Sequence, residues 1–249
     1  MSNTVKTKAL VLSSIRWKES SKIVTLYSAQ LGKIKVIARG AYKNNSAFAG
    51  KLESLQLSEF IILSKESRSL QILKEVEHFN SFNTIRMELN RLPYGLAILE
   101  LINQVLEDGS PDEVFFDFIV EMLHALENTK SPANVLIYFL LKLSSYMGFK
   151  PSLQDCSAGD LSKCADKVFL SLGNGKIFCR NCPTSYPNPI QLQKEQFFFL
   201  KNLQNLNHRR LGKWEFTRFD TMILIQRLIS YINFHFEKNI HIEALQLLS

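Results

Sequence analysis

The spacing of apolar residues changes near residue 80, and this change limits the chain to a fold with two differently built parts. Before that point, β-branched and apolar residues gather in five short segments, at residues 8–12, 23–27, 33–39, 55–63 and 70–76. Gly32 and the polar stretch 40–51 separate some of these segments as turns and loops. Five short strands predict a small barrel, and the oligonucleotide-binding (OB) type is the common barrel with that number of strands.

After residue 80, apolar residues recur every three or four positions, which is the period of a helix with one buried face. Pro93 predicts a kink or a break between two helices. Ser110 is the expected N-cap of the next helix, with Glu113 completing a capping box. Further helices are expected up to residue 126, between Ser131 and Gly148, and over residues 191–206 and 219–236. We therefore expect an α+β, multidomain protein, with a barrel domain at residues 1–80 and a mainly helical domain at 81–249.

All four cysteines fall within 27 residues, inside the stretch 151–189 that interrupts the helical pattern. They are Cys156, Cys164, Cys179 and Cys182. Cys179 and Cys182 form a CxxC, which lets two thiolates reach one tetrahedral ion, whereas Cys156 and Cys164 are more widely spaced. Unrelated free thiols would rarely cluster in this way, disulfides are disfavoured in the cytosol, and a redox CxxC expects a βαβ pattern. We predict a structural zinc ion on all four thiolates, which would organise a segment too small for a core of its own.

The excess of positive charge lies in the first third of the chain. Residues 1–80 hold 13 Lys and Arg against six Asp and Glu, whereas residues 81–249 hold 17 of each. A basic barrel joined to a neutral helical part indicates a polyanionic partner, either nucleic acid or an anionic membrane surface. No apolar run is long enough for a membrane span or a signal peptide, which makes a cytoplasmic location the expected one.

Alternation in the segment 33–39 sends Lys33, Lys35 and Arg39 to one face of a strand and Ile34, Val36 and Ala38 to the other. Cations at alternate positions can follow a phosphate backbone, although most such lysines belong to an ordinary solvated face. The candidate nucleic-acid-binding residues are Arg16, Lys22, Lys33, Lys35, Arg39, Lys43 and Lys51. Aromatic residues that could stack on bases lie nearby in the sequence, namely Trp17, Tyr27, Tyr42 and Phe48.

Motifs of common enzyme sites are missing from the sequence. It contains no Walker P-loop, GxGxxG, GxSxG or HExxH, and the five histidines share no metal or triad spacing. We therefore expect a binding protein and not an enzyme. The weakest alternative is an enzyme whose active site matches none of these motifs. A zinc-containing RNA-binding or ribosome-associated adaptor would explain the charge, the barrel and the zinc equally well.

Several short motifs occur in an order that is typical of one family. They are Glu19 to Leu26 (ESSKIVTL), Gly32-Lys33-Ile34, Ala38-Arg39-Gly40, Leu52-Glu53, Met147 to Pro151 (MGFKP), the CxxC, and Tyr231 to Phe236 (YINFHF). Over nearly its full length the chain resembles the bacterial recombination mediator RecO, and this ordered set favours DNA over RNA.

The resemblance implies an N-terminal OB fold, a helical domain with a zinc-finger-like insertion, and a role in recombinational repair. Members bind single- and double-stranded DNA, anneal complementary strands, act with RecR, engage the C-terminal tail of the single-strand-binding protein (SSB) and help to load RecA. The partners that the resemblance implies are therefore DNA, RecR, the SSB tail and, indirectly, RecA, and no membrane is among them. It also implies that the protein is associated with the nucleoid.

The family's motifs can be carried over to a few positions of this chain. Lys33, Lys35, Arg39 and Lys43 match its basic strand and loop, and Cys179 and Cys182 match its second CxxC. Cys156 lies where the first CxxC of the family begins. The sequence then departs from the family's pattern, because the next cysteine is Cys164.

Overall fold

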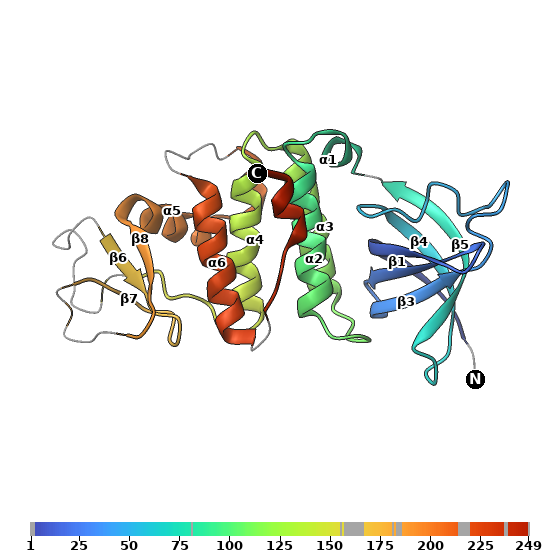
Figure 1. The fold of residues 1–249 in the computed structure, drawn as a ribbon, viewed down its shortest axis with the longest axis horizontal. Coiled ribbons are helices and arrows are strands. Elements are labelled where there is room, and N and C mark those ends of the chain that lie inside the picture. The colour runs from blue at the N-terminus through green and yellow to red at the C-terminus, as the bar shows by residue number, and fades with distance from the viewer. Residues whose placement is uncertain are drawn as a thin grey trace. The chain divides into compact units, whose positions relative to one another are not determined.

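The computed structural model describes residues 3–80, 82–154, 156, 167–180, 182, 186–213, 220–236 and 239–248. The chain forms two compact units. One comprises Met1–Glu127 together with Ile242–Ser249, and the other comprises Asn128–His241. A barrel and the first helices build the first unit, while later helices and a small sheet build the second (Figure 1).

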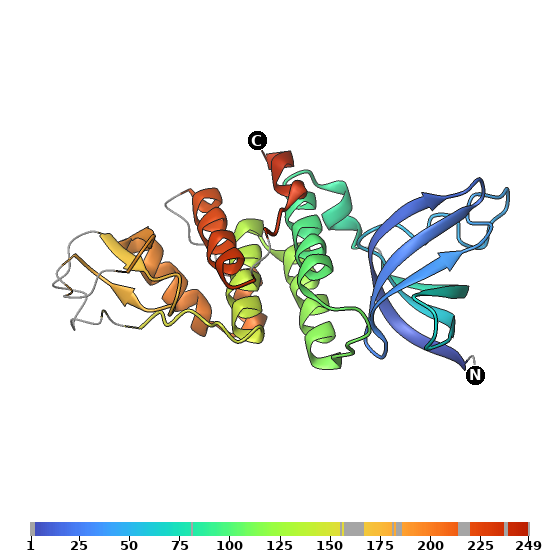
Figure 2. The same ribbon diagram turned by 60° about the horizontal axis from the view of Figure 1, so that its bottom comes forward.

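The barrel has five strands, β1 (Asn3–Trp17), β2 (Ser21–Ser28), β3 (Gly32–Ala38), β4 (Leu57–Ser64) and β5 (Leu70–Asn80). They close in the order β1-β2-β3-β5-β4, with β3 and β5 parallel and the other pairs antiparallel. The long β1 pairs with both β2 and β4, and an irregularity between Val11 and Ser13 accompanies its strong curvature (Figure 2). The predicted five-stranded OB-type barrel is confirmed.

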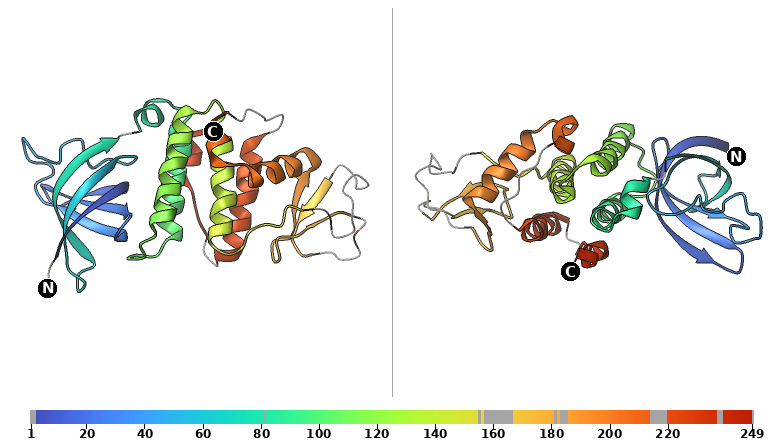
Figure 3. Two further views of the ribbon diagram at one scale, coloured as in Figure 1. Left: turned by 180° about the vertical axis from the view of Figure 1, so that it is seen from behind. Right: turned by 90° about the horizontal axis from the view of Figure 1, so that it is seen from above.

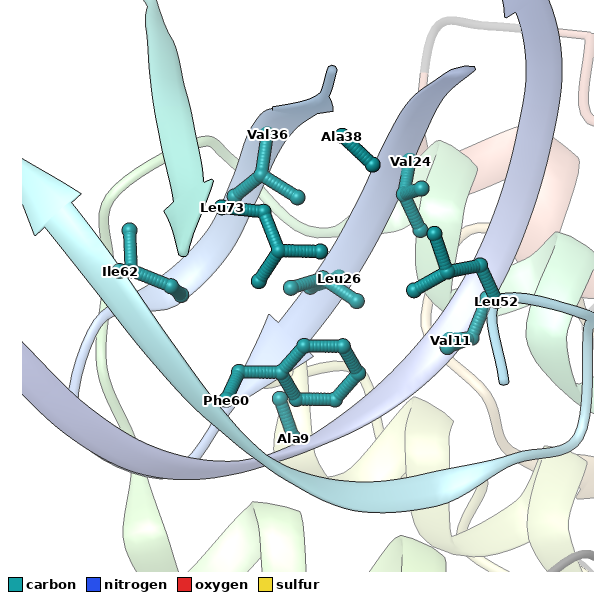
Figure 4. Close-up of a cluster of buried hydrophobic side chains, with 10 residues drawn as sticks. All are labelled: Ala9, Val11, Val24, Leu26, Val36, Ala38, Leu52, Phe60, Ile62 and Leu73. Carbon is teal, nitrogen blue, oxygen red and sulfur yellow. The ribbon is translucent and has the colours of Figure 1, made fainter. Parts of the chain in front are cut away.

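Alternate residues of the strands fill the barrel, as the predicted period of two requires. Val36 and Ala38 of β3 are fully buried, and Phe60 of β4 lies among the side chains drawn in Figure 4. Leu52, from the loop between β3 and β4, also belongs to this cluster. Because every second residue of β3 points inward, the intervening residues Lys35 and Ile37 lie on the outer surface.

Three helices belong to the same unit as the barrel, α1 (Asn83–Met87), α2 (Leu92–Val105) and α3 (Glu113–Asn128). Pro93 stands in the first turn of α2, so the predicted break between two helices is confirmed. The expected N-cap at Ser110 is wrong. Asp112 precedes α3 directly, and its Oδ1 accepts a hydrogen bond of 2.8 Å from the N–H of Phe115.

The β2–β3 turn lies against the segment between α2 and α3. Lys33 Nζ donates to the carbonyl oxygen of Asn103 at 2.8 Å and lies 3.3 Å from Asp108 Oδ1. The N–H of Gly109 donates to the carbonyl oxygen of Lys33 at 2.9 Å. Gly32, with a φ of +67°, approaches Ser110 so closely that a Cβ would lie 2.5 Å from its carbonyl carbon. The barrel is therefore bound to the first helices by backbone contacts that leave no room for a side chain.

The second unit contains α4 (Pro132–Tyr146), α5 (Lys194–Asn205) and α6 (Thr221–Phe236), with the 3₁₀ helix η2 (His208–Lys213). α4 lies beside α6 in both views of Figure 3. The small sheet has the order β7-β6-β8, with β6 (Lys167–Leu170), β7 (Ile177–Phe178) and β8 (Ile190–Gln193), and it lies mostly inside the predicted insertion at 151–189. A further 3₁₀ helix, η3 (Glu243–Leu248), belongs to the first unit, where the N–H of Ala244 donates to Glu100 of α2.

An aromatic cluster joins α6 to the chain that follows α4. The His235 ring lies parallel to that of Phe149 with 4.5 Å between centroids, and the Tyr231 hydroxyl donates to the carbonyl oxygen of Phe149 at 2.9 Å. Burial raises the pKa of Tyr231 to about 12. Burial lowers the pKa of His235, against a smaller opposing effect of a backbone hydrogen bond with Leu172.

The lowered pKa of His235 predicts a pH-dependent stability of this unit. The unfolded chain binds a proton at His235 below its ordinary pKa of about 6.5, whereas the folded chain resists protonation until a lower pH. The stability that neutral His235 contributes to the folded state is therefore present above about pH 6.5. It is lost as the pH falls through the pKa of His235 in the folded protein. Urea unfolding at pH 7.5 and pH 5 should show a smaller loss of stability for His235→Phe than for the unsubstituted protein. An equal loss in both would contradict the assignment.

None of the helices in the described part of the chain combines the length and the apolar character needed to cross a membrane.

Candidate nucleic-acid interface

Three exposed cations lie on β3 and in the segment that follows it. Lys35 and Arg39 are exposed because Val36 and Ala38 occupy the inner face, and Lys43 is exposed in the following loop. Among the residues that the structure describes, none of these three side chains forms an ion pair. Their charges therefore remain available to an anionic ligand.

The β1–β2 turn lies against the loop that follows β3. The N–H of Tyr42 donates to the carbonyl oxygen of Ser20 at 3.1 Å, which ties the loop after β3 to this turn. The guanidinium carbon of Arg16 lies 5.1 Å from the centroid of the Tyr42 ring, and Lys22 Nζ lies 5.9 Å from it. Such cation–π contacts orient an exposed aromatic ring without neutralising the cation.

A concave pocket of about 680 Å³ opens between the turn and the loop. Its lining combines cationic, amide and aromatic side chains. They include Trp17, Lys18, Ile37, Arg39, Lys43, Asn44, Asn45 and Phe48. Trp17 is 44% exposed and lines the pocket, so part of its side chain is accessible. The pocket therefore offers charge and a flat apolar surface to the same ligand.

Two of the candidate lysines are held by acidic neighbours. Lys22 is 8% exposed, and its Nζ lies 2.7 Å from Glu53 Oε1. Lys33 is held in the same way by Asp108, through the contact already described. The exposed candidates are Lys35, Arg39, Lys43 and Arg16, while Lys51 is half-buried. The sequence gives no local sign of these two ion pairs, because Glu53 lies 31 positions from Lys22 and Asp108 lies 75 positions from Lys33.

Tyr27 is not part of the exposed aromatic set. It is fully buried and packs against Phe115 and Phe116, with ring centroids 6.4 and 5.8 Å away. The prediction that Tyr27 could stack on bases is therefore wrong, whereas Trp17 and Tyr42 lie at the surface. Phe48 is half-buried and packs against the barrel core.

A cluster of thiols lies in the second unit. The Sγ atoms of Cys156, Cys179 and Cys182 all lie within 4.8 Å of one another, close enough to bind one metal ion. The Sγ atoms of Cys156 and Cys182 are 3.1 Å apart, and those of Cys179 and Cys182 are 3.9 Å apart. The N–H of Cys179 donates to Cys182 Sγ at 3.3 Å. Cys164, the fourth predicted ligand, lies outside the described residues.

These features define a class: proteins with an N-terminal OB-type barrel and a helical region whose insertion holds a thiol cluster. The family model "Recombination protein O N terminal" matches residues 1–82, and "Recombination protein O C terminal" matches residues 86–242. The chain belongs to the RecO family of DNA repair proteins. This membership supports a role in recombinational repair.

Curated relatives carry the name DNA repair protein RecO. One from Salinibacter ruber is 33% identical over 175 residues, which cover 70% of this chain and 66% of the relative. One from Desulforamulus reducens is 29% identical over 235 residues, covering 94% and 91%. One from Syntrophobacter fumaroxidans is 25% identical over 238 residues, covering 95% and 94%.

Proposed function

We propose that the protein is a non-catalytic mediator of recombinational repair that binds single- and double-stranded DNA and anneals complementary strands. The observation that carries this proposal is the set of three exposed cations, Lys35, Arg39 and Lys43, on β3 of an OB-type barrel and in the segment that follows this strand. Each phosphate that these cations neutralise releases condensed counterions into solution, and this release favours binding at low salt.

Annealing follows from the same charges. Two complementary strands repel each other through their phosphates, and a cationic surface that contacts both lowers this repulsion. Base pairing then supplies the driving force, so the protein needs neither a nucleophile nor ATP for this step. Family membership supports further partners, namely RecR, the SSB C-terminal tail and, through RecR, the loading of RecA on SSB-coated DNA.

Competition between DNA and RNA of matched sequence tests the proposed substrate. A fluorescein-labelled DNA strand is bound to the protein, and unlabelled DNA or RNA is added while anisotropy is followed. The proposal expects DNA to compete at least as well as RNA, with affinity falling as salt rises. A strong preference for RNA would favour an RNA-binding adaptor instead.

We infer that the thiol cluster binds a structural zinc ion, with Cys164 as the fourth ligand. Zinc–sulfur bonds of about 2.3 Å in a tetrahedron place sulfur atoms about 3.8 Å apart. The Cys179–Cys182 separation of 3.9 Å matches this value, and the Cys156 and Cys182 sulfur atoms, at 3.1 Å, are closer together than it requires. Bound zinc would cross-link residues on both sides of the β6–β7 strand pair and leave no position for a catalytic water.

Metal analysis tests the zinc site. Freshly purified protein should contain about one zinc per chain, and Cys182→Ser should lose it, because three ligands bind zinc far more weakly than four. Cys164→Ser tests the ligand that the structure does not describe, and Ser171→Ala serves as a control near the same sheet. Full reactivity of all four thiols in a metal-free native protein would contradict the proposal.

A further inference from the structure

We propose that the outer face of the barrel holds a platform for unpaired bases, built from a row of isoleucines and Trp17. This inference rests on the proposed DNA-binding function and deepens it, because it says how the site would distinguish a single strand from a duplex. We call the set Ile15, Trp17, Ile23, Ile37 and Ile72 the base platform.

The isoleucines are brought into one row by strand register. Ile15 of β1 pairs with Ile23 of β2, Ile23 pairs with Ile37 of β3, and Ile37 pairs with Ile72 of β5. Four adjacent strands thus carry the same residue at the same level of the sheet. Since paired residues share a face, the four side chains lie side by side.

This row points away from the barrel core. The chain neighbours Val24, Val36 and Leu73 are at most 3% exposed and lie inside, so the alternation turns Ile23, Ile37 and Ile72 outward. Ile15 is 60% exposed, and Ile37 and Ile72 are partly exposed. Single surface isoleucines are ordinary, but four side by side across four strands form a patch that fits an apolar ligand.

Trp17 and the pocket extend the platform at one side. Trp17 follows Ile15 by two residues on β1, and its exposed ring lines the pocket together with Phe48. Ile37 belongs both to the row and to the lining of the pocket. The apolar surface is therefore continuous from the sheet into the pocket.

Cations flank this apolar surface along the chain, Lys35 on β3 and Arg39 directly after that strand. Lys35 and Arg39 stand two residues before and two residues after Ile37, and both are exposed. A ligand that covers the row brings its charged groups to these two side chains. The combination fits a strand of unpaired nucleotides, which presents flat apolar base faces and anionic phosphates together.

A duplex cannot use the platform, because its base faces are stacked inside the helix. It can still reach Lys35, Arg39 and Lys43 through its phosphates. The cations would therefore bind both single-stranded and double-stranded DNA, whereas the base platform would bind unpaired strands alone.

Substitution of Trp17 tests this division. Trp17→Ala, alone and with Ile15→Thr, should weaken binding to an oligodeoxythymidylate by about 5-fold to 100-fold, the range for loss of one stacked base. Affinity for a duplex of equal length should change less than about 2-fold, because a duplex is bound through its phosphates. Both side chains are exposed, so the fold should persist, and Phe234→Ala, which removes an exposed aromatic ring from the other unit, is the matched control.

Fluorescence gives an independent readout. The chain has two tryptophans, Trp17 and Trp214, so Trp214→Phe leaves Trp17 as the only reporter. Oligodeoxythymidylate should quench it, whereas an abasic strand with the same number of phosphates should bind without quenching.

Each contrary outcome has its own meaning. Equal affinity and equal fluorescence for the abasic and the thymidine strands would overturn the platform while leaving phosphate-based DNA binding intact. Failure of every strand to bind at low salt would overturn the proposed function and the platform with it. Trp17→Ala that spares DNA binding but weakens binding of purified RecR would also overturn the platform, and would assign the row to a protein contact.

Discussion

The double substitution Lys35→Glu with Arg39→Glu is expected to weaken DNA binding by roughly 10-fold to 100-fold at low salt, and to make the remaining binding less sensitive to salt. Each lost phosphate contact removes about 0.9 from the slope of log K against log salt for duplex DNA, and about 0.7 for single strands. Because both side chains are exposed, the loss of two phosphate contacts should make the slope shallower by about 1.4 to 1.8. Titration of labelled oligonucleotides at several salt concentrations measures both quantities.

A matched control separates this local effect from net charge. Lys65→Glu with Arg68→Glu makes the same change in net charge on the same barrel, in the turn between β4 and β5. This control should keep most of the affinity. A well-folded Lys35/Arg39 variant that binds as tightly as the control would show that the interface lies elsewhere.

Gly32→Ala is expected to destabilise the first unit by about 2 to 5 kcal/mol, the sum of a left-handed backbone cost and of a forced movement of neighbouring backbone. Its φ is +67°, and the added Cβ would lie 2.5 Å from the carbonyl carbon of Ser110. The β2–β3 turn must then move away from Ser110 and weaken the contacts that Lys33 makes with Asn103 and Asp108. Urea unfolding followed by circular dichroism measures the loss.

Gly109→Ala isolates the backbone part of this cost. Gly109 has a φ of +76°, but no neighbouring atom lies within 4 Å of the point that a Cβ would occupy. The substitution should therefore cost only about 1 to 2 kcal/mol. Equal losses for the two variants would mean that the close approach of Gly32 to Ser110 adds no steric cost, which would contradict the packing of the β2–β3 turn against Ser110.

Local patterns in the sequence predict the barrel well, because each strand is specified by its own alternation. Val36 and Ala38 are buried where the period of two places them, and Lys35 and Arg39 are exposed. The isoleucine row also had a local signal, since Ile23 and Ile37 alternate with core residues. Its alignment across four strands depends on register, however, which a single sequence does not specify.

Contacts between residues far apart in sequence account for what could not be predicted. Lys22 and Lys33 look like free cations in the sequence, yet each meets an acid from a distant segment, Glu53 or Asp108. Tyr27 looks like a surface aromatic, but α3 covers it. The close spacing of the cysteines in the sequence predicts the thiol cluster, and the sulfur atoms of Cys156, Cys179 and Cys182 lie together in the structure.

Annealing tests the central claim most directly. Complementary labelled oligonucleotides are mixed with the purified protein, without ATP, across a salt series, and pairing is followed by energy transfer. We expect the protein to accelerate pairing, the acceleration to fade as salt rises, and the Lys35→Glu, Arg39→Glu variant to lose most of it. Tight binding of both strands without faster pairing would contradict a mediator and would leave a passive DNA-binding protein.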